Sequence, residues 1–187
     1  GLYPSIASCI PLVSEIVKLI QENSDAEFEV RFGQVSSNGR FKPGVSREFM
    51  DYVIDLMQSS PYVEGDSVWR EETDFFFQHE GHQLRTRVEY DSNTMEVTST
   101  TTKKSLLCTP TDLCQYLSNR ERGTIDVRVS LKSETPYASV PNAVQPNLVR
   151  IKQHRRFVTQ NNQWAFDFSM TWQGTSKSEA EASQMKD

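Results

Sequence analysis

The sequence predicts an α+β protein in which an antiparallel β-barrel is packed by a few outer helices. Three observations favour this fold class. From residue 68 onward, most segments are rich in β-branched or aromatic residues and are bounded by turn residues, which is typical of strands. Short turns such as 80–81, 91–93 and 160–162 separate these segments, which indicates an antiparallel meander. A sheet of this many strands in a small domain usually closes into a barrel, because closure removes its exposed edges.

Length, charge and cysteine content narrow the class of protein. The 187 residues can bury a real core but would be cramped as two domains, so we expect a single domain over residues 1–187. A formal net charge of -5 and a pI near 5.3 argue against a broad basic surface for long nucleic acids. No apolar run is long enough to cross a bilayer, so we expect no membrane partner. Three cysteines without a CxxC motif favour a reducing compartment, the cytosol or the nucleus.

Helices are predicted before the strand-rich part and at one place within it. Apolar residues recur at helical spacing over residues 9–22, and this helix should pack on the apolar side of the first strand. A second helix is expected to begin at Ser46 as its N-cap. Its expected buried side is formed by Phe49, Val53, Leu56 and Met57. Residues 109–119 are predicted to be a short helix, and residues 136–147, which contain three prolines, a loop.

The first strand, over residues 25–33, has the strictest alternation in the sequence. One face is apolar, and the other carries Glu27, Glu29 and Arg31. Two carboxylates at positions i and i+2 repel each other unless a cation lies between them. Mg²⁺ and Mn²⁺ prefer such oxygen ligands and keep positions open for water and phosphate. Glu27 and Glu29 are therefore candidate metal ligands, and the alternative is an amphipathic strand whose polar face is merely solvated.

Later strands within residues 125–134, 150–156 and 164–172 also separate polar from apolar side chains. Two arrangements fit this pattern. Either the apolar faces form a barrel core with the ionic faces in water, or the ionic faces line a cavity and helices cover the apolar outside. The first is commoner in small antiparallel proteins, whereas the density of both charge signs argues for the second. Because charges turned inward need partners, a metal or an ionic ligand, such a cavity would suit a metal-bound polyphosphate.

The segment 27–33, Glu-Phe-Glu-Val-Arg-Phe-Gly, resembles the first metal-binding strand of the triphosphate tunnel metalloenzymes. It is particularly similar to Glu-x-Glu-x-Lys/Arg-Phe-Gly of the fungal and protozoan mRNA-capping RNA 5′-triphosphatases. Matching segments follow in the same order from Glu27 to about Ser183. The resemblance implies a triphosphate tunnel, a barrel with a polar interior, in which Glu27 and Glu29 hold Mg²⁺ or Mn²⁺.

Three further strands carry the resemblance. Residues 126–134 resemble Asp-x-Lys/Arg-x-Ser-x-x-x-Glu, which implies that Arg128 contacts phosphate and that Glu134 orients or deprotonates the attacking water. Residues 150–156 resemble the strand Arg-x-Lys-x-Arg-x-Ser/Thr. His154 stands where this strand has its second arginine, so either the histidine serves or a bulge turns a later arginine, Arg155 or Arg156, inward. Residues 163–171 resemble Arg-x-Asp-x-Thr, with alanine in place of the arginine and serine in place of the threonine.

The site that the resemblance implies is larger than the metal pair. The implied catalytic residues are Glu134, Arg128 and Lys152, the metal ligands Glu27 and Glu29, and the phosphate-binding residues Arg31, Arg85, Arg87, Lys103, Lys104, Arg150, His154, Arg156 and Asp167. The sequence does not decide which of Arg85 and Arg87, or of Lys103 and Lys104, faces the tunnel. The family also has a second metal strand, Glu-x-Glu-x-Glu, which we expect beyond Asp187, because the segment around Glu179 and Glu181 resembles a charged helix or tail.

The activity that the resemblance implies is metal-dependent removal of the γ-phosphate from 5′-triphosphate pre-mRNA, the first step of cap formation. Free nucleoside triphosphates and tripolyphosphate are further expected substrates, and an mRNA guanylyltransferase is an expected partner. The expected location is the nucleus, or the cytoplasm for viral or parasite-specific capping. Two alternatives stay open: another tunnel-family phosphatase, acting on inorganic triphosphate or thiamine triphosphate, and a non-catalytic barrel that binds a protein or a small ligand.

Overall fold

The computed structural model describes residues 6–66, 68–108 and 125–186, with side chains described over residues 14–66, 68–107 and 125–186. The chain divides into two compact units, the first formed by residues 1–46 and 104–135 and the second by residues 47–103 and 136–187. The predicted helix at 109–119 lies outside the described residues. Among the described residues, no helix combines the length and the apolar character that crossing a bilayer requires.

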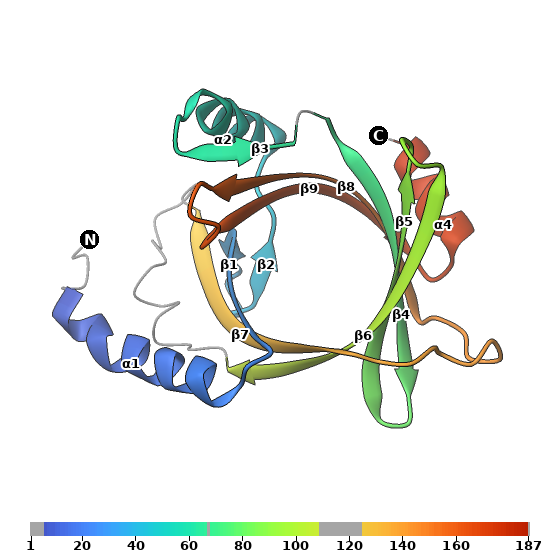
Figure 1. Cartoon of the computed structure of the whole chain (residues 1–187), viewed down its shortest axis with the longest axis horizontal. Coiled ribbons are helices and arrows are strands. Elements are labelled where there is room, and N and C mark those ends of the chain that lie inside the picture. The colour runs from blue at the N-terminus through green and yellow to red at the C-terminus, as the bar shows by residue number, and fades with distance from the viewer. Residues whose placement is uncertain (1–5, 67, 109–124, 187) are drawn as a thin grey trace. The chain divides into compact units, whose positions relative to one another are not determined.

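The first unit is a small antiparallel sheet with one helix (Figure 1). Its elements are α1 (Ile6–Glu22), β1 (Ala26–Val35), β2 (Phe41–Pro43), the end of β6 (Glu96–Cys108) and β7 (Asp126–Pro136). They are ordered β2-β1-β7-β6, and the expected turn at residues 36–39 joins β1 to β2, with Gly39 at a φ of 78°. Ile16 of α1 packs against Phe28 and Val129. The helix therefore lies on the apolar side of the first strand, as the sequence predicts.

The second unit contains the longer sheet and two helices. Its elements are α2 (Arg47–Ser59), β3 (Val63–Gly65), β4 (Arg70–His79), β5 (His82–Asp91), residues 96–103 of β6, β8 (Leu148–Thr159), β9 (Ala165–Gly174) and α4 (Lys177–Met185). The order is β6-β5-β4-β8-β3, and β9 also pairs with β8. The strand segments expected at 150–156 and 164–172 correspond closely to β8 and β9, and residues 137–147 form the predicted loop. The three-residue strand β3 was not predicted.

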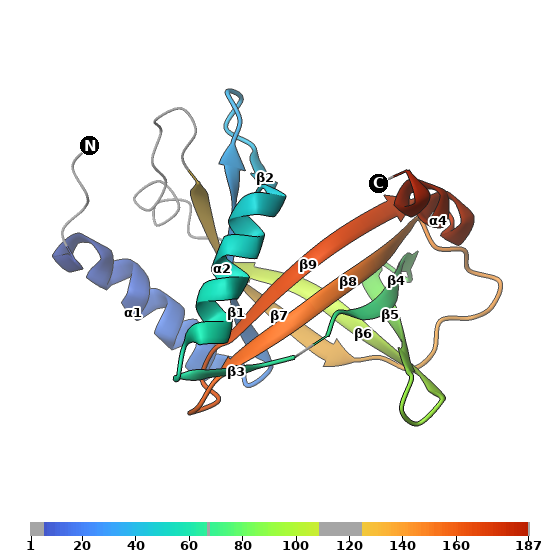
Figure 2. The ribbon, with the colours of Figure 1, turned by 90° about the horizontal axis from the view of Figure 1, so that it is seen from above.

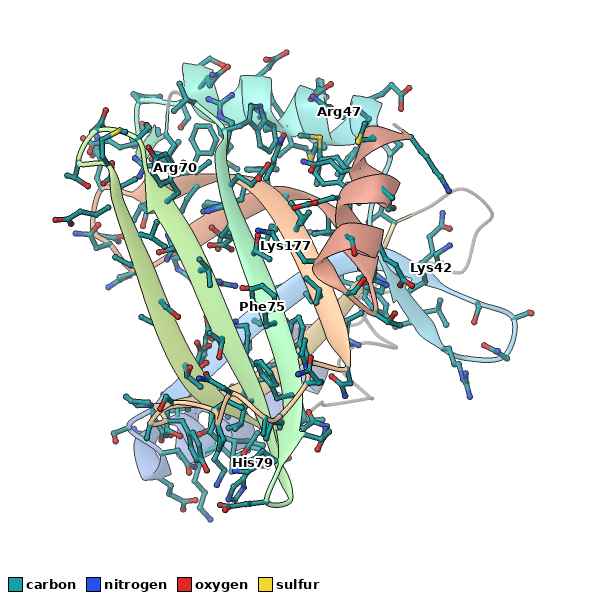
Figure 3. The ribbon with its side chains drawn as sticks, turned by 90° about the vertical axis from the view of Figure 1, so that its right-hand side faces the viewer. Lys42, Arg47, Arg70, Phe75, His79 and Lys177 are labelled. Atoms are coloured by element: carbon teal, nitrogen blue, oxygen red, sulfur yellow. The ribbon has the colours of Figure 1, made fainter. Side chains whose placement is uncertain are left out.

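Both helices of the second unit cover the same face of its curved sheet, the face that carries the apolar side chains. Ala180 of α4 packs with Val149 and Ile151 of β8 and with Phe75 of β4. Figure 3 shows α4 over this face near the labelled Phe75. α2 lies across β8 and β9 (Figure 2), where its Met50 and Ile54 pack with Phe157. The opposite face of the sheet, which holds the alternate residues of each strand, is left to the polar side chains.

The prediction of which side of α2 is buried is wrong, because the helix is rotated slightly about its axis relative to the expected orientation. Met50 and Ile54 are buried, whereas Phe49 and Leu56 are 37% and 52% exposed. Met57, which was expected in the core, does pack against it. The error has a physical reason: the apolar stripe of α2 is broad, and the sequence alone does not show which edge of the stripe, that of Leu56 and Phe49 or that of Met50 and Ile54, faces the sheet.

Candidate active site

The first unit gathers its charged residues on one face of the β1–β7 pair. In the register of the two strands, Glu27 lies opposite Lys132, Glu29 opposite Ser130, and Arg31 opposite Arg128. The intervening residues, such as Phe28, point to the other face, where α1 packs. The separation of the ionic and apolar faces that the alternation predicts is therefore confirmed for this pair of strands.

Lysines pair with the carboxylates of this face. Lys132 Nζ donates to Glu29 Oε1 at 3.1 Å, and Lys104 Nζ lies 3.5 Å from Glu134 Oε2. The four side chains are 26% to 37% exposed, so these pairs are neither buried nor fully in water. The pairs fix the direction of Glu29 and Glu134, the two carboxylates to which the sequence assigns metal ligation and water activation.

Buried polar atoms on the same face lack hydrogen-bond partners. The hydroxyl of Ser130, a residue that is 1% exposed, and the Nε of Arg128 have none. The Arg128 guanidinium instead lies 4.9 Å from the ring centroid of Phe41. An unsatisfied buried polar atom costs roughly 1–3 kcal/mol, and an ion, a water molecule or a ligand is the usual explanation. The ionic face of the first unit therefore offers donors for an anionic ligand.

The carboxylate pair on β1 fits the metal that the resemblance implies. Glu27 and Glu29 share a face of the strand and present hard oxygen ligands. Mg²⁺ is commonly held by one or two carboxylates, with water and substrate phosphate completing its six ligands. No group of three acidic, histidine or cysteine residues that could hold a metal occurs within residues 14–66, 68–107 and 125–186. The pair of carboxylates on β1 suits a metal ion that binds together with phosphate.

The second unit holds a buried ionic cluster on the face opposite its helices. Glu72 and Asp74 of β4 are 3% and 2% exposed. Arg87 binds Asp74 through two hydrogen bonds, Nε to Oδ1 at 2.8 Å and Nη2 to Oδ2 at 3.0 Å. Lys152 Nζ lies 3.0 Å from Glu72 Oε1, and His154 Nε2 lies 3.5 Å from Glu72 Oε2. The cluster thus holds the lysine and the histidine of β8 at the centre of the sheet.

The cluster shifts the pKa values of its members in different directions. Burial alone would raise the pKa values of Glu72 and Asp74, but Lys152 beside Glu72 and Arg87 beside Asp74 hold both below their usual values. The hydrogen bond that the Glu89 carboxyl donates to Glu72 raises the pKa of Glu89. Burial lowers the pKa of His154 despite the nearby Glu72. His154 is therefore neutral near pH 7.

Glu89 makes a testable contribution to the pH dependence of stability. Because its folded-state pKa is raised above the ordinary 4.5, its stabilising contribution is present below pH 4.5 and is lost as the pH rises through the folded-state pKa. Glu89→Gln keeps a donor for Glu72 without titrating. We expect the rise in Tm between pH 4.5 and pH 7 to be larger in Glu89→Gln than in the unmodified chain, measured by circular dichroism. Glu96→Gln, on exposed β6, is the control, and parallel curves for Glu89→Gln and the unmodified chain would contradict the assignment.

The register decides the orientations that the sequence left open. Arg85 and Arg87 are two residues apart on β5 and share the ionic face with Lys152. Lys103 lies opposite Leu84, whose side chain is on the helix side, whereas Lys104 points the other way and pairs with Glu134. Among the two lysines, Lys104 therefore remains the candidate for the ionic face.

No bulge interrupts β8, because its register with β9 is continuous from Val149 to Val158. His154 therefore stays on the ionic face in the arginine's place, together with Arg150 and Arg156. Arg156 Nη1 lies 3.3 Å from Asp167 Oδ2 in an exposed pair. Arg155 points to the helix side, where its guanidinium donates to the Asp66 carbonyl at 2.8 Å and 3.1 Å. Its role is therefore structural.

Sequence reasoning missed Glu72, Asp74 and Glu89 as members of the site. The signal was present, since Glu72 and Asp74 have the same i, i+2 spacing as Glu27 and Glu29. Three consecutive phenylalanines after Asp74 put aromatic rings on both faces of β4, so the alternation of its sequence does not separate an ionic face from an apolar one.

Comparisons with known proteins agree with this arrangement at the level of the fold. No protein-family model matches the chain, and no curated protein matches it in sequence. The RNA triphosphatase Pct1 of S. pombe is similar in structure, with a TM-score of 0.60 and 17% identity, over 93% of this chain and 74% of that chain. Pct1 in complex with the Spt5 CTD gives a TM-score of 0.63 and 16% identity, over 93% and 75%. The match to the RNA triphosphatase domain of a mimivirus mRNA capping enzyme covers 91% of this chain and 82% of that chain at 12% identity, with a TM-score of 0.47. The chain has the fold of the tunnel-type RNA triphosphatases.

Proposed function

We propose that this chain is a metal-dependent RNA 5′-triphosphatase that removes the γ-phosphate from 5′-triphosphate pre-mRNA, the first step of cap formation. One observation carries the proposal: in each unit, charged side chains of both signs gather on one face of the sheet while helices cover the other. Such a face suits a polyphosphate with its metal ion, because both need fixed partners of opposite charge. The shared fold with Pct1 supports the same activity.

The proposed metal ligands are Glu27 and Glu29. Bound there, Mg²⁺ or Mn²⁺ would polarise a phosphoryl oxygen and neutralise developing negative charge. Lys132 holds Glu29 in one direction through its 3.1 Å hydrogen bond. Arg31, whose Nε lies 4.0 Å from Glu29 Oε1, stands next to the metal ligands on the same strand and would bind phosphate.

The proposed reaction is hydrolysis of the bond between the β- and γ-phosphates. Glu134 orients a water molecule toward the γ-phosphorus and takes its proton, and the β-phosphate oxygen leaves with the RNA as a 5′-diphosphate end. Arg128 has an Nε without a hydrogen-bond partner to donate to phosphate. Lys152 supplies positive charge, and neutral His154 supplies a hydrogen bond in place of the family's arginine. Most of the rate enhancement would come from this fixed arrangement of charge.

The remaining phosphate contacts are assigned to the other cations of the ionic faces. They are Lys104, Arg85, Arg87, Arg150 and Arg156, the last oriented by Asp167. We propose that the chain works with an mRNA guanylyltransferase, which would use the 5′-diphosphate product. The corresponding location is the nucleus, or the cytoplasm for viral or parasite-specific capping.

Three substrates separate the proposed function from its alternatives. Phosphate release is measured from triphosphate-ended RNA, tripolyphosphate and thiamine triphosphate, each with Mg²⁺, with Mn²⁺ and with a chelator. We expect metal-dependent release, with the highest kcat/KM for RNA. Faster cleavage of tripolyphosphate or thiamine triphosphate would favour another tunnel-type phosphatase. Absence of release from all three substrates would contradict the proposal and favour a non-catalytic ligand-binding protein.

A further inference from the structure

Phe76 is an aromatic residue on the ionic face of the second unit. It lies two residues beyond Asp74 on β4, so both side chains point to the same face. In the register of the sheet, Phe76 lies opposite Arg85 on β5 and opposite Leu148 on β8. The guanidinium of Arg150 lies 5.1 Å from the centroid of the Phe76 ring. A hydrogen bond from Asn147 N to the Phe76 carbonyl, at 2.9 Å, fixes the backbone at this point.

Burial does not explain why a phenylalanine occupies this position. The preceding residue, Phe75, packs against Val149 and Ile151 on the helix side, where an aromatic ring is expected. Phe76 is partly buried like Phe75, but its neighbours on the ionic face include Arg85 and Arg150. Aromatic rings and arginine guanidinium groups are, however, the side chains on which proteins stack nucleobases.

The ionic face changes in character along β4. Glu72 lies four residues from Phe76, which corresponds to about 13 Å of strand. At the Glu72 end, Lys152 and His154 pair with the Glu72 carboxylate, whereas the other end carries the ring of Phe76 together with Arg85 and Arg150. Thr102, opposite Arg85 on β6, has a buried hydroxyl without a hydrogen-bond partner. The Phe76 end thus combines an aromatic ring with two arginines and a free hydroxyl group, which suits a nucleobase that is joined to phosphate.

We infer that the Phe76 ring forms a subsite for the first nucleobase of the substrate, while Arg150, a phosphate contact in the proposed function, lies against the same ring. The inference rests on the proposed function and names its substrate class: a nucleotide-ended triphosphate, as in RNA or a nucleoside triphosphate, in preference to tripolyphosphate. Phe76 is thereby a specificity-determining residue.

Binding measured without turnover tests the subsite. Calorimetry of the full chain compares ATP with tripolyphosphate in the presence of a chelator, so that neither ligand is hydrolysed. For Phe76→Leu we expect the ratio of ATP affinity to tripolyphosphate affinity to fall about 5- to 100-fold, the equivalent of the ~1–3 kcal/mol of one stacked base. Phe76→Trp should keep the ratio. Phe77→Leu is the matched control, because it makes the same change one residue away on the opposite face of β4. An unchanged ratio in Phe76→Leu would overturn the inference.

If Phe76→Leu does not fold, the subsite can still be tested by changing the ligand in place of the protein. The unmodified chain should bind ATP more tightly than ribose 5-triphosphate, which lacks the base, and equal affinities would overturn the inference. The outcomes that contradict the proposed function differ from those that contradict the subsite. A chain that binds ATP through Phe76 but releases no phosphate from RNA contradicts the triphosphatase proposal alone, whereas a chain that hydrolyses RNA with equal affinities for ATP and ribose 5-triphosphate contradicts the subsite alone.

Discussion

Replacing both Glu27 and Glu29 by alanine is expected to lower metal-dependent phosphate release by at least about 100-fold, the equivalent of ~3 kcal/mol of transition-state stabilisation. The two carboxylates are the only hard ligands that β1 presents on its ionic face, and water cannot replace their charge. The change also removes the acceptor of the Lys132 hydrogen bond and leaves this lysine without the carboxylate. The measurement is γ-phosphate release from triphosphate-ended RNA, together with the affinity for Mn²⁺.

Two controls make this result specific. Glu22→Ala removes an exposed carboxylate at the end of α1 and should leave the rate within about two-fold, because a solvent-exposed charge of this kind contributes little. Urea unfolding of the Glu27→Ala/Glu29→Ala double variant should give a free energy of unfolding near that of the unmodified chain. A variant that folds, binds Mn²⁺ normally and releases phosphate at the original rate would show that these residues hold no catalytic metal.

Asp74→Ala is expected to destabilise the fold by about 3–5 kcal/mol, the usual cost of removing one partner from a buried ion pair. The side chains of Asp74 and Arg87 are 3% and 23% exposed, and two hydrogen bonds join them. Removal of Asp74 leaves the Arg87 guanidinium in the interior with Glu72, at 3.3 Å, as its nearest carboxylate. The measurement is the free energy of unfolding in urea.

An exposed pair on the same sheet provides the comparison for Asp74→Ala. Arg156 and Asp167 are 53% and 44% exposed. Asp167→Ala should therefore change the free energy of unfolding by less than about 1 kcal/mol. Equal effects of the two substitutions would mean that the Asp74–Arg87 pair does not hold the centre of the sheet together.

The alternation of β1 and β7 was sufficient to predict their two faces. A strand has a period of two residues, and both strands have one mainly apolar side, so a slip of one residue would turn Phe28 or Val129 away from α1. The same rule places Arg85 and Arg87 together, because they are two residues apart. The sequence interpretation treated them as alternatives, since β5 lacks a clean apolar side.

Other features depend on contacts that no single segment reveals. Lys103 and Lys104 are adjacent on β6, so their side chains point to opposite faces of the sheet. The pairing of Lys103 with Leu84 on β5 determines which lysine lies on which face. The buried state of Glu72 follows from the strands on both sides of β4, which supply Arg87 and Lys152. Burial of a carboxylate depends on partners from distant segments, so its own sequence neighbours do not predict it.

The pairing of β1 with β7 also governs when this protein can fold during synthesis. Ala26 pairs with Ser133, and the strands between them belong largely to the other unit. While the ribosome makes those strands, the edge of β1 that pairs with β7 has no neighbouring strand, and its backbone hydrogen-bonding groups must wait for the later segment to emerge. Such long-range closure slows folding and exposes nascent chains to aggregation, so we expect this protein to depend on chaperones more than a protein built from successive hairpins.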